Sequence, residues 1–355
     1  MLKKIVAGLL CSAIFSLSFA QEAETKEPEK SPLEITGFAD IFYRYDFAKT
    51  SANNLTSFTN AHNSFTLGMA SVKFAKSFGK VGMVADLGFG QRAKEFSYND
   101  EGITAGVKQL YVTYAPTDKL TFSFGSWATH VGYELVDAPA NRNYSMSYMF
   151  SYGPFFHTGA KAEYSFGNSA IMLGVANPTD TKLSADAPRM ILGQFSTGTA
   201  DGKLKAYLNY LGGKGTDTTK MNQIDAVITA AVSDKFSIGY NGTVASFKEK
   251  TNGKFGSANS WWGSAIYLNA DVSETFGLTL RTELFNDKKQ LNVFGGAAKG
   301  GNIFANTLSA KIGLGDLTII PEIRVESASQ PIFINGKSGG SKSAGSALIA
   351  AIYSF

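Results

Sequence analysis

Cysteine is almost absent from this sequence, in which Cys11 is the only one among 355 residues. It lies within residues 1–20, MLKKIVAGLLCSAIFSLSFA, where a basic start precedes an apolar stretch that ends on a small-x-small pattern. This order predicts a signal peptide cleaved before Gln21, so the exported chain would have no disulfide. Something other than disulfides must then stabilise it, and a closed β-barrel would do so.

Long hydrophobic runs are also missing. After residue 20 no run of 18 apolar residues occurs, which excludes membrane-spanning helices. Apolar residues still make up 44% of the chain, too many for a disordered protein, and they recur at every second position as in strands. In the first such segment, Ile35, Gly37, Ala39, Ile41, Tyr43 and Tyr45 share one face, and Thr36, Phe38, Asp40, Phe42 and Arg44 share the other.

A strong charge of one sign is the third feature that the sequence lacks. Removal of Lys3 and Lys4 with the signal peptide lowers the formal net charge from +4 to +2, so we expect no nucleic-acid partner. Residues 21–32, QEAETKEPEKSP, have no apolar residue beyond Ala23 and predict a flexible periplasmic leader. The folded part is therefore expected over residues 33–355.

The connections between the expected strands alternate in length. Short turns rich in Gly, Asp, Asn and Pro are predicted at 77–80, 116–119, 167–168, 200–203, 233–235, 273–275 and 315–316. Longer polar connections are predicted at roughly 47–62, 92–104, 129–157, 178–188, 211–221, 248–258, 286–302 and 327–343. This alternation predicts an all-β fold, a transmembrane antiparallel up-and-down barrel of about 16 strands with short periplasmic turns and long external loops.

The end of the chain fits a barrel of the bacterial outer membrane. Ala347, Ile349, Ala351, Tyr353 and Phe355 form one apolar face, and the last residue is aromatic. A terminal strand of this kind is what outer-membrane barrels present to the insertion machinery, so we expect Tyr353 and Phe355 to act as the insertion signal. An ordinary edge strand that ends on Phe is the alternative.

Several segments resemble the OmpL-like family of β-barrel porins. These are NSFTLGMAS (63–71), GKVGMVADLGFGQRA (79–93), the stretch 108–167 that runs from KQLYVTYAPTDKL to HTGAKAEYSFG, and LTIIPEIRVE (317–326). The resemblance is close up to about residue 178, and beyond it lies mainly in the spacing of strands and turns. It implies an outer-membrane channel, and it does not identify the solute.

The longest connection, 129–157, is the third external loop by our count. In general porins this loop folds into the lumen and narrows it. We therefore expect Glu134, Asp137 and Arg142 to oppose one another at the constriction and to create a transverse field, with Tyr144 and Tyr148 supplying bulk. The alternative is an external cap whose aromatic residues pack on one another above the rim.

Charges on the predicted inward faces should line the lumen, because a lone charge facing lipid near the midplane is costly. They are Asp40, Arg44, Asp86, Arg92, Lys161, Glu163, Lys205, Asp225, Arg281, Glu283, Lys311, Glu322 and Arg324. We expect a wet, open lumen, since sixteen strands leave an aqueous channel. A lumen closed by paired salt bridges is the alternative.

Catalytic and cofactor motifs are weak. Residues 88–93, GFGQRA, match a dinucleotide fingerprint, but no helical apolar period follows, so no such site is expected. His62, His130 and His157 lack metal-site spacing. His130 and His157 flank the long connection and could meet in space, yet no nucleophile, base and orienting group can be placed together. We expect no enzyme, no metal and no cofactor.

These features favour a porin that lets small hydrophilic solutes or ions diffuse passively. The alternative is a structural or adhesive outer-membrane barrel with a plugged lumen. Expected partners are outer-membrane lipid and lipopolysaccharide, the barrel-insertion machinery and the solutes, and analogy with general porins adds a homotrimer.

Overall fold

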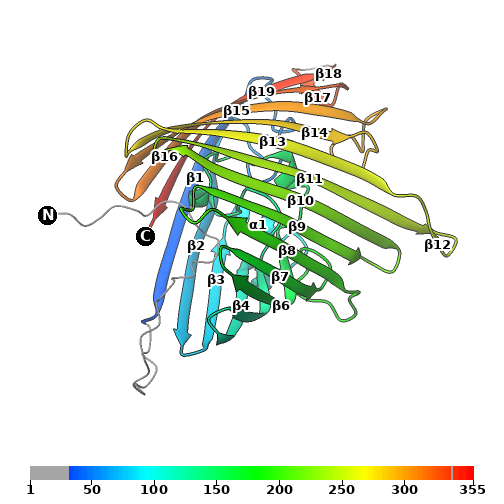
Figure 1. The fold of residues 1–355 in the computed structure, drawn as a ribbon. Helices are drawn as coiled ribbons and strands as arrows, with labels where there is room; N and C mark the ends of the chain where they lie inside the picture. The colour runs from blue at the N-terminus through cyan, green and yellow to red at the C-terminus, as the bar shows by residue number, and fades with distance from the viewer. Residues whose placement is uncertain (1–31, 337–338) are drawn as a thin grey trace.

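The computed structural model describes residues 32–336 and 339–355, and these residues form a closed antiparallel β-barrel (Figure 1). The expected signal peptide, and all of the expected leader except its last residue, lie outside the described residues. Sixteen long strands make up the barrel in the described part of the chain. They are β1 (Glu34–Asp46), β2 (Ser64–Phe78), β3 (Val81–Phe89), β4 (Val107–Thr117), β5 (Leu120–Ala128), β6 (Phe156–Phe166), β7 (Ser169–Ala176), β8 (Met190–Gly198), β9 (Leu204–Lys214), β10 (Thr219–Ser233), β11 (Phe236–Thr251), β13 (Asn259–Asp271), β14 (Phe276–Asp287), β15 (Gly301–Leu314), β16 (Leu317–Ala328) and β19 (Ser343–Ser354).

The barrel closes between its first and last strands. β1 pairs with β2 on one side and with β19 on the other, so that Ile41 lies opposite both Leu67 and Ala351. Each strand otherwise pairs with its neighbours in sequence, as an up-and-down barrel requires. Closure satisfies the backbone groups that an open sheet edge would leave unpaired in lipid, and the predicted fold and strand number are confirmed.

Two of the predicted long connections are wrong. The connection expected at 211–221 shrinks to residues 215–218, because β9 runs to Lys214 and β10 starts at Thr219. Instead of a loop over 248–258, β11 continues to Thr251 and folds back onto the short β12 (Lys254–Phe255). Backbone pairing can continue beyond the bilayer, so polar composition by itself does not end a strand.

The two faces of the wall differ as the alternation predicts. Outward side chains include Phe65, Leu67 and Leu173, which are 83%, 74% and 63% exposed, and exposed apolar positions of this kind suit a lipid environment. Inward positions on the same strands are mostly polar or small. Among residues 32–336 and 339–355, no helix has the length and apolar character to cross a membrane.

Loops fill much of the interior. The connection 129–155, named here the lumen loop, contains the short helices η2 (Ala138–Ala140) and α2 (Tyr148–Ser151). It packs with the first external loop, residues 47–63, and with α1 (Gln91–Phe96). The short helix η1 (Gly102–Gly106) follows α1 in the chain. Figure 1 shows α1 among segments surrounded by the strands. The last external loop holds the hairpin β17 (Phe333–Asn335) and β18 (Gly339–Ser341).

The helix α1 was not expected from the sequence. It follows Gly90, where the sequence has no helical apolar period. Phe96 is buried, with its ring 6.0 Å from that of Phe155 and 5.2 Å from that of Phe156 between centroids. Contacts with the lumen loop thus stabilise a helix that local propensity does not predict.

Candidate functional site: the loop-filled lumen

The lumen loop crosses the barrel interior and is hydrogen-bonded to the wall through its own backbone. The backbone N–H groups of Gly132, Tyr144 and Tyr148 donate to carboxylates on three different strands. The acceptors are Asp225 of β10 at 3.0 Å, Glu322 of β16 at 3.0 Å and Glu283 of β14 at 2.8 Å. Irregular backbone at membrane depth needs such partners, and the inward carboxylates provide them.

Each charge expected at the constriction forms an ion pair with the barrel wall. Glu134 lies 2.6 Å from Arg281 of β14, and Asp137 lies 2.6 Å from Lys108 of β4. Arg142 makes two 2.8 Å hydrogen bonds to Asp271 of β13. The ion-pair partners of these three loop charges are therefore charges of the wall, and the transverse field at a constriction stays a prediction.

Two tyrosines anchor the middle of the loop, and both are fully buried. The hydroxyl of Tyr144 donates to Asp40 of β1, and the guanidinium of Arg92 lies 4.6 Å from the centroid of the Tyr144 ring. The hydroxyl of Tyr148 donates to Glu326 of β16 at 2.7 Å. The predicted bulk of these residues is thus combined with hydrogen bonds to inward acids.

A glycine on β13 leaves room for the loop. A Cβ atom at Gly263 would lie 2.3 Å from the Cγ atom of Met149, closer than any real contact. Glycine within a strand often marks such a close approach. The wall and the loop therefore fit each other at this point.

The predicted lumen charges fall into two groups. The first group is buried and either ion-paired or hydrogen-bonded, and it comprises Asp40, Arg44, Asp86, Asp225, Arg281, Glu283, Glu322 and Arg324. The second group is partly buried or exposed and has no ion-pair partner within 4 Å among the described residues. It comprises Lys161, Glu163, Lys205 and Lys311. Arg92 belongs to α1 instead of a strand, and its guanidinium donates to the carbonyls of Val136 and Tyr144.

Burial on the inward face extends around the whole barrel. Every long strand contributes at least one buried inward side chain. These are Asp40, Ser71, Asp86, Lys108, Trp127, His157, Met172, Leu192, Asn209, Asp225, Asn241, Tyr267, Arg281, Thr307, Glu322 and Leu348. Paired charges, the alternative considered from the sequence, are among these residues, and the open lumen stays a prediction.

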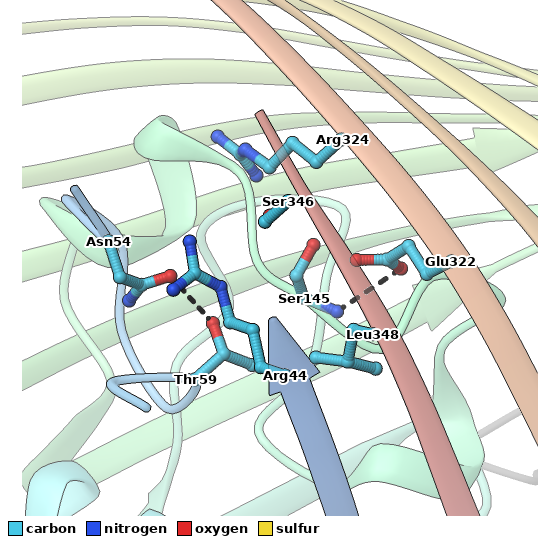
Figure 2. Close-up of a pocket in the computed structure, with 8 residues that line it drawn as sticks. All are labelled: Arg44, Asn54, Thr59, Ser145, Glu322, Arg324, Ser346 and Leu348. Carbon is cyan, nitrogen blue, oxygen red and sulfur yellow. Dashed lines mark hydrogen bonds between the residues drawn. The ribbon is translucent and has the colours of Figure 1, made fainter. Parts of the chain in front are cut away.

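A small cavity marks where three parts of the molecule meet. It is lined by Arg44, Asn54, Thr59, Ser145, Glu322, Arg324, Ser346 and Leu348, from the lumen loop, the first external loop and strands β1, β16 and β19. Figure 2 shows Thr59 bonded to Asn54, and Ser145 bonded to Glu322 across the gap. Its volume of about 10 Å³ holds about one water molecule.

The end of the lumen loop is fixed by the fourth external loop. The carboxylate of Asp180 accepts the backbone N–H groups of Phe155 and Phe156 at 2.7 and 3.0 Å. The hydroxyl of Tyr98 also donates to Asp180. Burial raises the pKa of Asp180 to about 6, although these donors oppose the shift.

The two histidines flanking the loop do meet, with ring centroids 5.2 Å apart. The Nε2 atom of His130 bonds to the carbonyl of Tyr210, and that of His157 bonds to Thr129. Within residues 32–336 and 339–355, no group of three or more His, Cys, Asp or Glu side chains could hold a metal ion. The pair by itself therefore indicates neither a metal site nor a catalytic triad.

Sequence reasoning missed three of the wall partners, Lys108, Asp271 and Glu326. Glu326 continues the alternation of Glu322 and Arg324, so a longer reading of that strand would have found it. Asp271 likewise follows Asn269 on the inward face of β13. Lys108 carried no such signal, because a register shift between β3 and β4 displaces the alternation beside it.

Comparison with solved structures reveals the same fold at low identity. The outer-membrane channel DcaP of Acinetobacter baumannii has a TM-score of 0.63 and 12% identity, covering 93% of this chain and 100% of that one. OmpT of Vibrio cholerae has a TM-score of 0.62 and 13% identity, covering 93% and 100%. An anion-selective porin from Comamonas acidovorans has a TM-score of 0.61 and 13% identity, covering 92% and 100%.

No curated protein matches this chain. The family model described as "Putative beta-barrel porin-2, OmpL-like" matches residues 32–355, which is the whole barrel. The predicted family is confirmed. The chain therefore belongs to this OmpL-like family of β-barrel porins of the bacterial outer membrane.

Proposed function

We propose that this barrel is a passive diffusion channel for small hydrophilic solutes or ions, with the lumen loop as its constriction. The observation that carries the proposal is the loop itself, which lies inside a closed porin-family barrel and is fixed there by Arg281, Lys108 and Asp271. Because charged and polar groups fill the constriction, passage would depend on size and on charge. The proposal involves no cofactor, no covalent chemistry and no energy coupling.

The test is single-channel recording of the purified barrel in planar bilayers, with and without residues 134–150. We expect a small conductance for the wild type, because the interior is packed at the height of the loop, and a several-fold larger one for the deletion. Heat-modifiable migration in gels would show that the deleted barrel is folded. Equal conductance and selectivity in the two proteins would contradict the constriction.

A second candidate is a structural or adhesive barrel whose lumen is plugged. The burial of inward side chains on every long strand favours it. Liposome swelling with small sugars, together with ion conductance, separates the two candidates. A folded wild-type barrel that passes neither sugars nor ions, beside a deletion that passes both, would favour the plugged barrel.

The proposed partners follow from the surface. Exposed outward residues such as Phe65 and Leu67 would contact outer-membrane lipid, and the external rim would contact lipopolysaccharide. The insertion machinery would bind the terminal strand at Tyr353 and Phe355, which are 50% and 60% exposed. A homotrimer is proposed by analogy with general porins, and native mass spectrometry in detergent tests it.

A further inference from the structure

We infer that the channel prefers small anions, because the inward fixed charges that have no ion-pair partner among the described residues are mostly lysines. This inference rests on the proposed channel function and names its substrate class. Its basis is a set of four inward lysines, Lys73, Lys161, Lys205 and Lys311, here called the lysine set.

The strand register places the lysine set inside the barrel. Lys161 lies opposite Ser123, and Lys205 is on the same face as the inward Asn209. Lys73 lies opposite Asp86, and Lys311 is two residues after the inward Ser309.

Lys205 and Lys311 lie near the short turns, whereas Lys73 and Lys161 lie nearer the middle of β2 and β6. Lys311 is exposed and the other three are partly exposed. None of the four has an ion-pair partner within 4 Å among the described residues. Their charges are therefore at least partly exposed and are not compensated by an ion pair among the described residues.

The inward acids differ from the lysine set, because most of them are buried or paired. Asp86 and Glu283 are buried in ion pairs, and Asp40, Asp225 and Glu322 are buried as hydrogen-bond acceptors. Asp271 is partly exposed but is held by Arg142 in a bidentate pair. Two acids of the inward face on this side of the barrel have no such partner among the described residues, namely Glu163, which is partly exposed, and Glu34, which is exposed at the start of β1. Four lysines therefore face two carboxylates.

Charges on the short turns do not reverse this balance. The turns carry both signs, in Lys80, Asp118, Lys119, Asp201, Lys203, Asp234, Lys235, Glu274 and Asp316. They stand at the rim, where water and salt screen them. Inside the barrel the low-dielectric wall focuses the field of the lysine set on a passing ion.

Lys161 has surroundings suited to an anion. Its ammonium lies 5.2 Å from the centroid of the Trp127 ring. The buried Nε1 of Trp127 and Nδ1 of His157, which faces Trp127 across the strand pair, have no hydrogen-bond partner among the described residues. A carboxylate, phosphate or chloride near this site would be attracted by the ammonium of Lys161.

The test is the reversal potential of the purified barrel in a planar bilayer under a potassium chloride gradient. We expect a chloride-to-potassium permeability ratio above one. A lysine about 8 Å from an ion in water changes its local concentration roughly twofold, so the variant K73Q/K161Q/K205Q/K311Q should lower the ratio several-fold.

Two single variants keep the test valid if the quadruple variant does not assemble. Glu163→Gln should raise the ratio and Lys161→Gln should lower it. Lys76→Gln is the matched control, because Lys76 is opposite the outward Met83 and should leave the ratio unchanged. If the folded barrel conducts but its chloride-to-potassium permeability ratio is at or below one, the anion preference is wrong and the channel function still holds. If the folded barrel does not conduct, the channel function on which the inference rests is wrong.

Discussion

At the scale of single residues, the arginines of the wall hold the lumen loop. Arg281 is fully buried, with Glu134 at 2.6 Å and Glu283 at 3.7 Å. It also donates to the carbonyl of Ser145 at 2.7 Å. The guanidinium of Arg281 therefore connects β14 with both ends of the loop segment 134–145.

Replacing Arg281 should destabilise the barrel. Arg281→Gln leaves the carboxylates of Glu134 and Glu283 buried with less compensation, which typically costs about 3–5 kcal/mol. The measurement is the free energy of unfolding in urea, followed by tryptophan fluorescence. Asp201→Asn, on an exposed turn, is the control, and a loss below about 1 kcal/mol for Arg281→Gln would argue against a structural role for this pair.

At the scale of elements, the lumen loop behaves as an inner layer of the barrel. Its partners come from β1, β4, β10, β13, β14, β15 and β16. Its return to β6 is fixed by Asp180. A loop held at so many points is expected to keep one position while the channel is intact.

A disulfide can test this position, since Cys11 is the only native cysteine. The side chains of Asn143 and Ser309 are hydrogen-bonded at 2.7 Å, which brings the two positions into the side-chain contact that a disulfide between them would require. We expect Asn143→Cys with Ser309→Cys to oxidise and to migrate faster in non-reducing gels. Conductance should be the same before and after reduction.

The single-cysteine variants serve as controls for that experiment. If reduction increases the conductance of the double variant but not of the single ones, the loop moves during conduction. If neither the disulfide nor a cross-link by a short bismaleimide forms in the folded barrel, the loop lies elsewhere.

At the scale of the whole molecule, closure depends on the contact between the first and last strands. Gly37 and Phe355 exchange two backbone hydrogen bonds of 3.0 Å. A Cβ atom at Gly37 would lie 2.5 Å from the Phe355 ring and 2.5 Å from the carbonyl oxygen of Ser71. Glycine is therefore required where three strands meet.

Gly37→Ala should weaken closure by about 1–3 kcal/mol, the usual cost of overpacking. Gly313→Ala is the matched control, because the nearest atom to its added Cβ would be 3.7 Å away. The measurement is the fraction of heat-modifiable barrel after refolding into detergent. Equal fractions for the two variants would show that the seam tolerates a side chain.

Local patterns in the sequence were sufficient to predict the barrel. Alternation of apolar and polar residues, the short turns and the terminal apolar face were enough for sixteen strands and for the inward position of most charged residues. Period-two alternation is a local property, because each side chain points to the face opposite its neighbour's. The segment 129–157 could be singled out for its length and its aromatic and charged residues.

The partners of those charges could not be predicted without the three-dimensional path of the chain. Glu134 and Arg281 are 147 residues apart in the sequence, and Arg142 and Asp271 are 129 apart, so no local pattern links them. Lys108 points inward only because of a register shift, and α1 forms only against the lumen loop. Which charges pair depends on the path of the lumen loop through the closed barrel. For that reason the sequence did not show that Glu134, Asp137 and Arg142 pair with charges of the wall.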